Sequence, residues 1–321
     1  MRNIHLRQTT SQDIDDQVRK ILRGLGNPEP PLRLEDVRAL QKLDKEFYSS
    51  NSDGILRETF SRLLVAGKQI LRRPSLLIDA IREAELKALY VPDRKMILLD
   101  ETVPPIKQRW NESHEIIHSV LDWHGSALLG DNQITLKLGC HEQIEAEANY
   151  GAGRLLFLQE RFDRVAWDTK LNFRAIKRIA DDFGNSMTST LWRSVEAMDI
   201  PALGVVSQHP HYIDSTFNPN SPCRYFVRSR KFEEKFAGVT EMQVFQIMQR
   251  LCNFRKGGPI GNDEIALSDD RGEPHLFSFE SFSNTYEVLT LILYLRPRST
   301  SVAVETIVTT PSRSQDKDWT R

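Results

Sequence analysis

The sequence has little cysteine, no excess charge of either sign and no long hydrophobic run. Its three cysteines, Cys140, Cys223 and Cys252, are too few and too scattered for a disulfide framework or a cysteine-rich zinc site. Lysine and arginine number 43 against 44 aspartates and glutamates, so bulk charge does not favour nucleic-acid binding. The sequence shows no signal-peptide run and no apolar stretch of about 18 residues. We therefore expect a cytoplasmic protein without a membrane segment.

The length and the apolar fraction of the chain allow a packed core. The length of 321 residues suggests about two domains. The hydrophobic fraction of 40% is enough for a packed core. Apolar residues recur at helical spacing through much of the first half, including a helix predicted over 55–72. Two short apolar runs separated by PDRK predict a β-hairpin over 87–100. The stretch 285–295 fits a strand as well as a helix.

These patterns predict an α+β protein. A mainly helical first domain carries the small hairpin or sheet, and a pair of short helices turns at Gly184 before a small mixed domain begins. The predicted boundaries are 1–165 for the first domain, 166–200 for the helical connector, 201–300 for the second domain and 301–321 for a flexible tail.

The chemically informative motif is HEIIH, inside a helix predicted over 106–123. His114 and His118 are four residues apart, so they lie on one helical face, about 6 Å from each other, and can share one metal ion. Glu115 is offset from that face and can take a proton from a water that the metal activates. A chance match would be the polar face of an exposed helix, but apolar residues flank the pair here, which indicates a buried helix.

A catalytic zinc ion takes a third protein ligand, and three residues compete for that role. Glu145, on a helix predicted over 141–159, can complete the site from a second, antiparallel helix. Glu147 points roughly 200° away around that helix, so both cannot face the metal. His124 has the spacing of the metzincins, which turn sharply at a glycine. Leu121 stands at that place, so the helix is expected to continue and to carry His124 away from the metal. The order of preference is Glu145, then His124, then Glu147.

With these motifs the chain resembles the ImmA/IrrE family of zinc metallopeptidases. The family pattern is HExxH, a loop, and a helix of the form E-x-x-A-N-x-F-A-x-x-L-L, and this sequence has HEIIH followed by EAEANYGAGRLLF at 145–157. Tyr150 and Gly151 replace the usual x-Phe pair, a departure that touches no ligand. The resemblance extends over residues 10–165.

The resemblance implies a zincin-like first domain with a defined ligand set. It assigns the metal to His114, His118 and Glu145, and the general base to Glu115. One Zn²⁺ per chain is expected, although histidine and carboxylate ligands also accept Mn²⁺ or Co²⁺. His141 and Tyr150 are candidates to stabilise the oxyanion of a tetrahedral intermediate, and the spacing selects neither.

The rest of the resemblance concerns binding and control. The hairpin stands where the family has an edge strand that can pair an extended substrate, which implies a substrate-binding strand formed by Met96, Ile97, Leu98 and Leu99. The connector resembles a helix-turn-helix, but packing against the peptidase domain is favoured over contact of Lys177, Arg178 and Arg193 with DNA. The second domain resembles a sensor-like or regulatory domain. His209 and His211, in QHPHY, are expected to be a loop feature without a third ligand.

The expected activity is that of a zinc-dependent endopeptidase acting on a protein substrate. The resemblance implies that this substrate is a DNA-binding transcriptional repressor, cleaved in a stress or mobile-element response. One alternative is a DNA- or protein-binding regulator whose metal site is structural or vestigial. Another is a toxin- or phage-associated protein whose peptidase partner is encoded nearby. The oligomeric state does not follow from the sequence.

Overall fold

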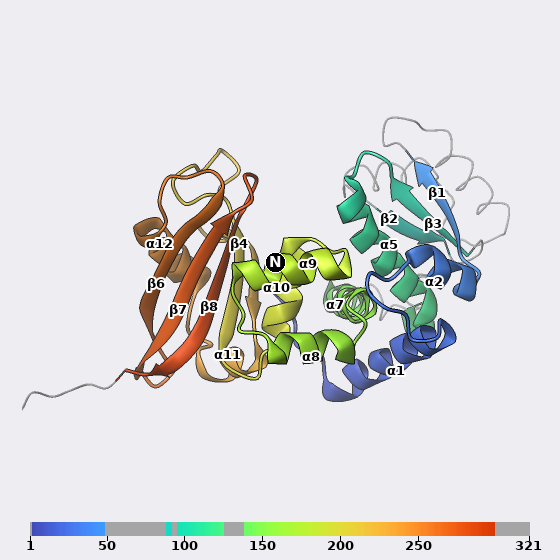
Figure 1. Cartoon of the computed structure of the whole chain (residues 1–321), viewed down its shortest axis with the longest axis horizontal. Coiled ribbons are helices and arrows are strands. Elements are labelled where there is room, and N and C mark those ends of the chain that lie inside the picture. Colours follow the sequence, from blue (N-terminus) through green and yellow to red (C-terminus); the bar gives the residue numbers. More distant parts are fainter. Residues whose placement is uncertain (1, 49–87, 92–94, 125–137, 299–321) are drawn as a thin grey trace, which may run out of the picture.

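The computed structural model describes residues 2–48, 88–91, 95–124 and 138–298, which form two β-sheets with helices between and around them (Figure 1). This arrangement confirms the α+β class. The helices are α1 (Gln8–Gly24), α2 (Leu34–Gln41), α5 (Pro105–Val120), α7 (Leu138–Leu156), α8 (Glu160–Asp168), α9 (Phe173–Phe183), α10 (Met187–Glu196), α11 (Arg230–Lys235) and α12 (Glu241–Leu251). The strands are β1 (Asp44–Tyr48), β2 (Ala88–Val91), β3 (Met96–Asp100), β4 (Ala202–Ser207), β5 (Cys223–Arg228), β6 (Gly258–Ser268), β7 (Pro274–Ser283) and β8 (Val288–Pro297). The helix predicted over 55–72 and the tail predicted over 301–321 lie outside the described residues.

The small sheet has the order β1–β3–β2, with β3 in its centre. β2 and β3 form the predicted antiparallel hairpin, in which Tyr90 lies opposite Ile97. β1 was not predicted, because its sequence DKEFY is largely polar and its strand form depends on parallel pairing with the buried β3. The substrate-binding edge assigned to residues 96–99 is wrong, since both sides of β3 already have strand partners and all its residues are buried.

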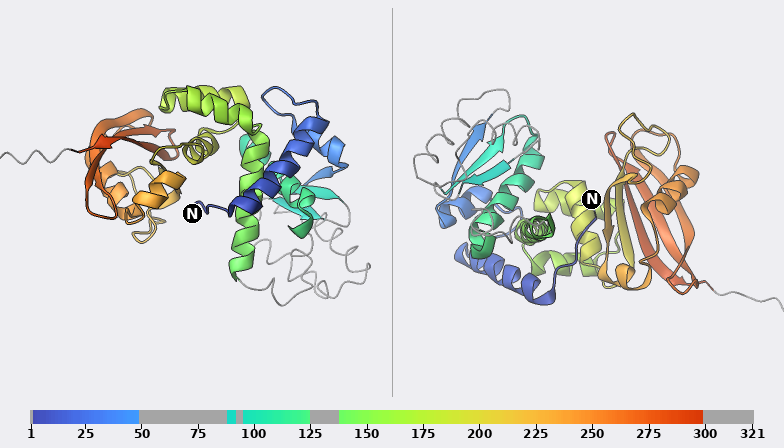
Figure 2. Two further views of the ribbon diagram at one scale, coloured as in Figure 1. Left: turned by 90° about the horizontal axis from the view of Figure 1, so that it is seen from below. Right: turned by 180° about the vertical axis from the view of Figure 1, so that it is seen from behind.

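α7 packs against both α5 and α1 (Figure 2), and Gly151 faces both of these helices. A Cβ atom at this position would lie 2.7 Å from Ile117 Cγ2 and 3.1 Å from Ile14 Cγ2. Ala148 and Ala152, on the same helix, are fully buried. Small residues therefore let α5 and α7, the two helices that carry the metal-site candidates, lie close together. The family pattern has phenylalanine at the position of Gly151, and the contacts with Ile117 and Ile14 leave no room for such a side chain here.

Replacing Gly151 by Ala should lower the free energy of unfolding by about 1–3 kcal/mol, because the added methyl group collides with Ile117. Gly153→Ala is the matched control on the same helix, since a Cβ there meets no atom closer than 3.8 Å. The control should instead gain up to about 1 kcal/mol from the better helix propensity of alanine. Urea denaturation of both variants measures the difference, and equal stabilisation by both would contradict this packing.

The connector turns at Gly184, whose φ of +65° places it in the left-handed region that favours glycine. α10 then packs against β4, β5 and β8 of the large sheet. Arg193 is buried there, and its guanidinium contacts Asp163 at 2.8 Å and Glu196 at 3.7 Å. Arg193 is therefore engaged within the protein. Phe183 of α9 packs on Phe157 and Phe162 of the predicted peptidase domain, as expected, whereas α10 lies on the large sheet.

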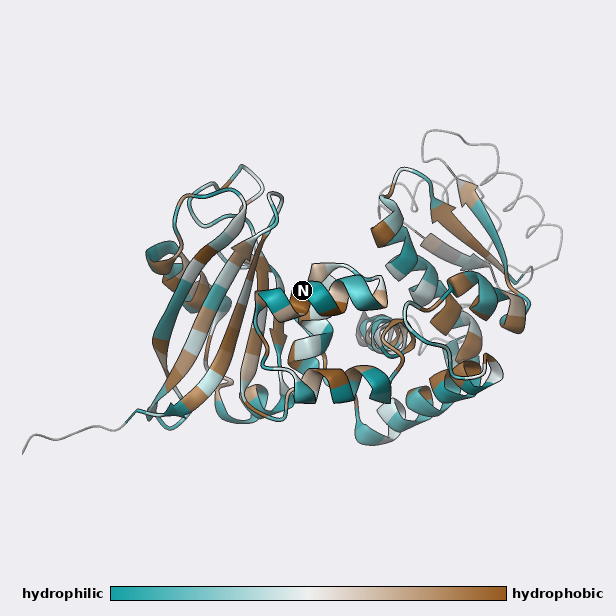
Figure 3. Cartoon of the chain, in the orientation of Figure 1, coloured by the Kyte–Doolittle hydropathy of each residue, from teal (hydrophilic) through white to brown (hydrophobic). Residues whose placement is uncertain are grey.

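The large sheet has the order β5–β4–β8–β7–β6 and is antiparallel throughout. Hydrophobic and hydrophilic bands alternate along its strands (Figure 3). α11 and α12 cover one face and α9 and α10 the other, so β8 is buried on both faces along its first half. This double burial explains why the hydrophobic pattern of 285–295 shows no clear period. Within the described part of the chain, no helix combines the length and the apolar character that crossing a membrane requires.

Candidate metal centre

α5 carries His114, Glu115 and His118 in its last two turns. The helix ends two residues after the motif, because Leu121 leaves it with an extended backbone (φ −93°, ψ 97°). The prediction that the helix continues past this point in the absence of a glycine is therefore wrong. A short turn follows and brings the His124 ring back to within 2.9 Å of His118.

Three side chains from α5 and α7 converge at one point. His114 Nε2 lies 3.1 Å from His118 Nε2 and 3.2 Å from Glu145 Oε2, and His118 Nε2 lies 3.6 Å from Glu145 Oε1. Ligand atoms about 2.0 Å from a tetrahedral metal ion are about 3.3 Å apart, so these distances fit one shared ion. Two imidazoles and a carboxylate are also a donor set of catalytic zinc sites. The Glu145 side chain is 39% exposed, so solvent reaches the centre from its side.

Glu115 lies buried beside this group, and its carboxylate accepts a hydrogen bond from the backbone N–H of Tyr90 on β2. Burial raises the pKa of Glu115 to about 7, against the lowering effects of His114 and of the Tyr90 N–H, and the charge of Glu145 adds to the rise. Burial also opposes ionisation of Glu145, but its contacts with His114 and His118 outweigh this and lower the Glu145 pKa. Glu115 is thus suited to exchange a proton near neutral pH, and Glu145 is suited to bind a cation.

The raised pKa of Glu115 predicts that the metal-free protein loses stability as the pH rises from about 4.5 to about 7. In this window the unfolded chain has released the proton while the folded chain still binds it, so rising pH favours unfolding. Glu115→Gln removes this titration. The free energy of unfolding of the Glu115→Gln variant, relative to that of the unmutated chain, should therefore increase by about 3 kcal/mol between pH 4 and pH 8.

Urea denaturation at both pH values measures this change. Glu142→Gln, at an exposed position of α7, is the control and should show no such pH dependence. A Glu115→Gln difference that stays constant from pH 4 to pH 8 would show that the folded protein does not hold the Glu115 proton.

The outward-facing ring nitrogens of both histidines also have partners. His114 Nδ1 lies 3.2 Å from Asn149 Oδ1, and the N–H donates to the amide oxygen when the proton is on Nδ1. Asn149 belongs to the family pattern, but no role in the site was predicted for it. Its spacing of four residues from Glu145 was the available signal, because residues four apart share a helical face.

His124 and Glu147, the two rivals for the third ligand position, lie behind His118. His118 Nδ1 is 2.9 Å from His124 Nδ1, and His124 Nε2 is 3.1 Å from Glu147 Oε2. Of the three competing residues, Glu145 is the one whose carboxylate reaches the Nε2 atoms of both motif histidines.

The structure does not support an oxyanion role for Tyr150. Its hydroxyl donates to Asp15 on α1 at 3.1 Å, and burial raises the Tyr150 pKa to about 12. Arg154 binds the same carboxylate at 2.6 Å. Five residues separate Tyr150 from Glu145, roughly 140° around α7, so the tyrosine faces α1. The side chain of His141 lies outside the described part of the structure, and its assignment stays a prediction.

The histidines of QHPHY form a loop feature, as expected. His209 Nε2 lies 3.0 Å from the carbonyl of Arg255, and His211 Nε2 lies 2.8 Å from the carbonyl of Cys252. Each Nε2–H donates to a backbone oxygen and ties one loop to the next. Neither nitrogen is free for a metal in this arrangement.

Asp269, Glu273 and His275 also lie close enough to share an ion. Asp269 already accepts the backbone N–H groups of Arg271 and Glu273 through Oδ1, which caps the turn between β6 and β7. Its Oδ2 contacts His275 at 3.2 Å and lies 3.9 Å from the Lys235 ammonium. The roles of Asp269 as a turn cap and as the partner of His275 and Lys235 explain why these side chains lie together.

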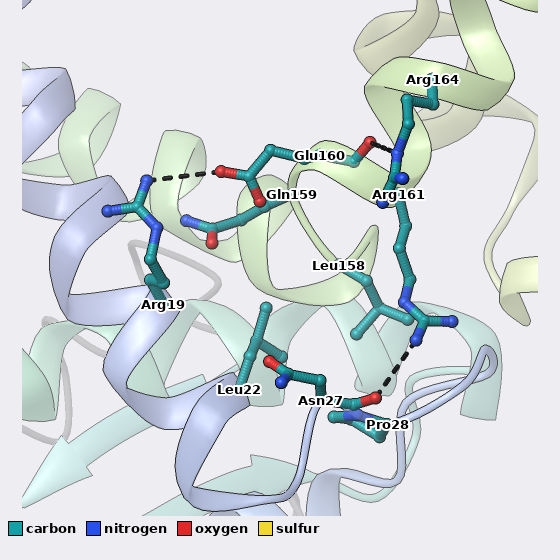
Figure 4. Close-up of a pocket in the computed structure, with 9 residues that line it drawn as sticks. All are labelled: Arg19, Leu22, Asn27, Pro28, Leu158, Gln159, Glu160, Arg161 and Arg164. Atoms are coloured by element: carbon teal, nitrogen blue, oxygen red, sulfur yellow. Dashed lines mark hydrogen bonds and ion pairs between the residues drawn. The ribbon is translucent and has the colours of Figure 1, made fainter.

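A cavity of about 210 Å³ lies between α1 and the start of α8 (Figure 4). Its arginines are engaged: Arg19 with the Glu160 side chain, Arg164 with the Glu160 carbonyl, and Arg161 with the Asn27 carbonyl. Its wall residues Leu158 and Gln159 follow the end of α7 at Leu156, which lies eleven positions, about 16 Å, along the helix from Glu145. The cavity is therefore separate from the metal centre.

Two histidines, a carboxylate and an adjacent buried glutamate form the type of centre found in metal-dependent peptidases. Residues 77–194, which include α5 and α7, match the peptidase family described as the IrrE N-terminal-like domain. The resemblance of this segment to the ImmA/IrrE family is thereby confirmed.

Among solved structures, the chain is similar to one described as a Mycobacterium tuberculosis transcriptional regulator. The two are 12% identical, with a TM-score of 0.49, and the match covers 98% of this chain and 94% of that chain. No curated protein matches the chain in sequence.

Proposed function

We propose that the chain is a zinc-dependent endopeptidase with a zincin-like peptidase part. His114, His118 and Glu145 bind the metal, and Glu115 is the general base. The observation that carries this proposal is the set of ligand-atom distances, 3.1–3.6 Å, beside a buried carboxyl whose pKa is about 7. The family match of residues 77–194 to a peptidase family supports the same class of activity.

A bound zinc ion would supply a lowered water pKa and a polarised peptide carbonyl. The chain supplies the proton transfers and the orientation. Glu115 in its carboxylate form accepts the proton of the attacking water and then donates it to the leaving amine. The N–H of Tyr90 holds one side of this carboxylate in place. His114 and His118 fix Glu145 through their contacts across α5 and α7.

An extended substrate pairs with β2 in this proposal. Among the described strands β2 lies at an edge of the small sheet, and the backbone N–H of Tyr90 donates to Glu115. A peptide added along this edge would place its own amide bonds next to the Glu115 carboxylate. The substrate strand therefore lies one position outward from the strand that the sequence analysis assigned.

The substrate class in this proposal is a DNA-binding repressor, and the large sheet provides control. Buried ion pairs support a connection between the two parts of the chain. Arg154 on α7 and Arg193 on α10 both bind Asp163 on α8, at 2.7 Å and 2.8 Å. α10 in turn packs on β4, β5 and β8. A rearrangement of the large sheet can thus reach the helix that carries Glu145.

A peptide library tests the proposed activity. The metal-free chain is incubated with peptides from a proteome digest, with and without one equivalent of Zn²⁺, and new termini are identified by mass spectrometry. We expect cleavage that depends on zinc and stops when a chelator is added. Zinc bound without any cleavage, together with sequence-specific DNA binding, would favour the regulator with a structural metal site.

A further inference from the structure

A hydrogen-bonded chain runs from His118 away from the metal-site atoms to a carboxylate on α7. His118 Nδ1 contacts His124 Nδ1 at 2.9 Å, and His124 Nε2 contacts Glu147 Oε2 at 3.1 Å. The His124 side chain is fully buried and that of Glu147 is 8% exposed. Buried polar groups with two defined partners keep one geometry, since no water competes for their hydrogen bonds.

The chain of contacts ends at the carboxylate of Glu147, which has three partners. Its two oxygens face three groups that can donate, on Gln143, Trp123 and His124. Gln143 Nε2 donates to Oε1 at 2.8 Å, and Trp123 Nε1 donates to Oε2 at 2.7 Å. Glu147 therefore acts only as an acceptor, and the proton between it and His124 belongs to His124 Nε2.

This fixed acceptor determines the protons of both histidines. A neutral imidazole carries one N–H, so His124 with its proton on Nε2 has a bare Nδ1. The 2.9 Å contact between the two Nδ1 atoms then requires that His118 Nδ1–H is the donor. His118 is left with an unprotonated Nε2, and this is the atom that faces His114 and Glu145.

We propose that His124 and Glu147 are positioning residues, which hold the proton of His118 on Nδ1 and thereby direct its Nε2 lone pair at the metal. This inference rests on the proposed metal site and adds residues that the ligand motif does not contain. In many zinc sites a carboxylate accepts a hydrogen bond directly from the metal-binding histidine. Here Glu147 acts indirectly, because the imidazole of His124 lies between it and His118.

The arrangement also explains how two glutamates on one helix serve one centre. Glu145 and Glu147 point roughly 200° apart around α7. Glu145 approaches the Nε2 side of His118, and Glu147 reaches its Nδ1 side through His124, which follows the end of α5. The ring of His118 is thus held from both sides by α7.

Zinc affinity of three variants tests the proposal, measured at one pH by competition with a chromophoric chelator. His124→Phe removes the acceptor and keeps a buried ring, so we expect zinc binding about 10–100-fold weaker. His124→Gln provides an amide oxygen that can accept from His118 and an amide N–H that can donate to Glu147, so it should restore most of the affinity. His275→Gln is the matched control, because His275 is an equally buried histidine paired with Asp269 at 3.2 Å in the large sheet. It should leave the zinc affinity unchanged.

The long-range ¹H–¹⁵N spectrum of the zinc-loaded, unmutated chain gives a second readout that needs no variant. We expect His118 with a protonated Nδ1 and a metal-bound Nε2. Coordination through Nδ1, or zinc affinity of His124→Phe equal to that of the unmutated chain, would overturn the proposal. Failure of the unmutated chain to bind zinc would instead refute the proposed function itself.

Discussion

Glu115→Gln should abolish peptide hydrolysis while the protein keeps its zinc. Glutamine has the same shape as glutamate but cannot accept the proton of the attacking water, and loss of a general base costs about 10²–10⁴-fold in rate. The zinc should stay because Glu115 is not part of the group whose atoms converge, which is His114, His118 and Glu145. The two measurements are kcat on a peptide that the unmutated chain cleaves and the zinc content after dialysis.

The control for this substitution is Glu142→Gln, at an exposed position of α7. It makes the same chemical change outside the centre and should leave both kcat and zinc content unchanged. Cleavage that persists in Glu115→Gln with full zinc occupancy would refute the assignment of the general base. Loss of zinc together with activity would show instead that Glu115 supports the ligands.

Glu145→Ala should weaken zinc binding more than any other single glutamate substitution on α7. The Glu145 carboxylate is the charged member of the candidate ligand set, with oxygens 3.2 Å and 3.6 Å from the two Nε2 atoms. Its loss removes a direct ligand, so the decrease should exceed the 10–100-fold that removal of an outer hydrogen-bonding partner costs. The affinity is measured by competition with a chelator.

Glu147→Ala and Glu142→Ala complete this series. Glu147 acts on the centre only through His124, so its removal should fall in the 10–100-fold range, and the exposed Glu142 should have no effect. A larger loss for Glu147→Ala than for Glu145→Ala would reverse the choice of third ligand. This series thus separates a direct ligand, an outer partner and a bystander on one helix.

The parts of the site that depend on spacing within one helix could be predicted from the sequence. His114 and His118 share a face of α5 because they are four residues apart, and the hairpin of β2 and β3 follows from two apolar runs around a turn. The packed form of α9 and α10 likewise agrees with their apolar faces and the turn at Gly184.

The parts that depend on a partner distant in sequence could not be predicted. β1 is a strand only because it pairs with β3, about fifty residues away. This pairing places β3 in the centre of the sheet, so that β2, among the described strands, lies at an edge instead. His124 was judged by helix geometry alone, whereas its place is determined by the turn at Leu121 and by Glu147 on another helix. The role of Tyr150 likewise depends on the fold, which places its hydroxyl on Asp15 of α1.

The zinc K-edge X-ray absorption spectrum of the zinc-loaded chain tests the central assignment most directly. Binding by His114, His118 and Glu145 predicts two imidazole ligands at about 2.0–2.1 Å and a remaining shell of oxygen at about 2.0–2.2 Å, with no sulfur. The same spectrum should appear for His124→Gln, since His124 lies behind His118. A third imidazole that disappears in His124→Gln, or a zinc–sulfur distance near about 2.3 Å, would contradict this ligand set.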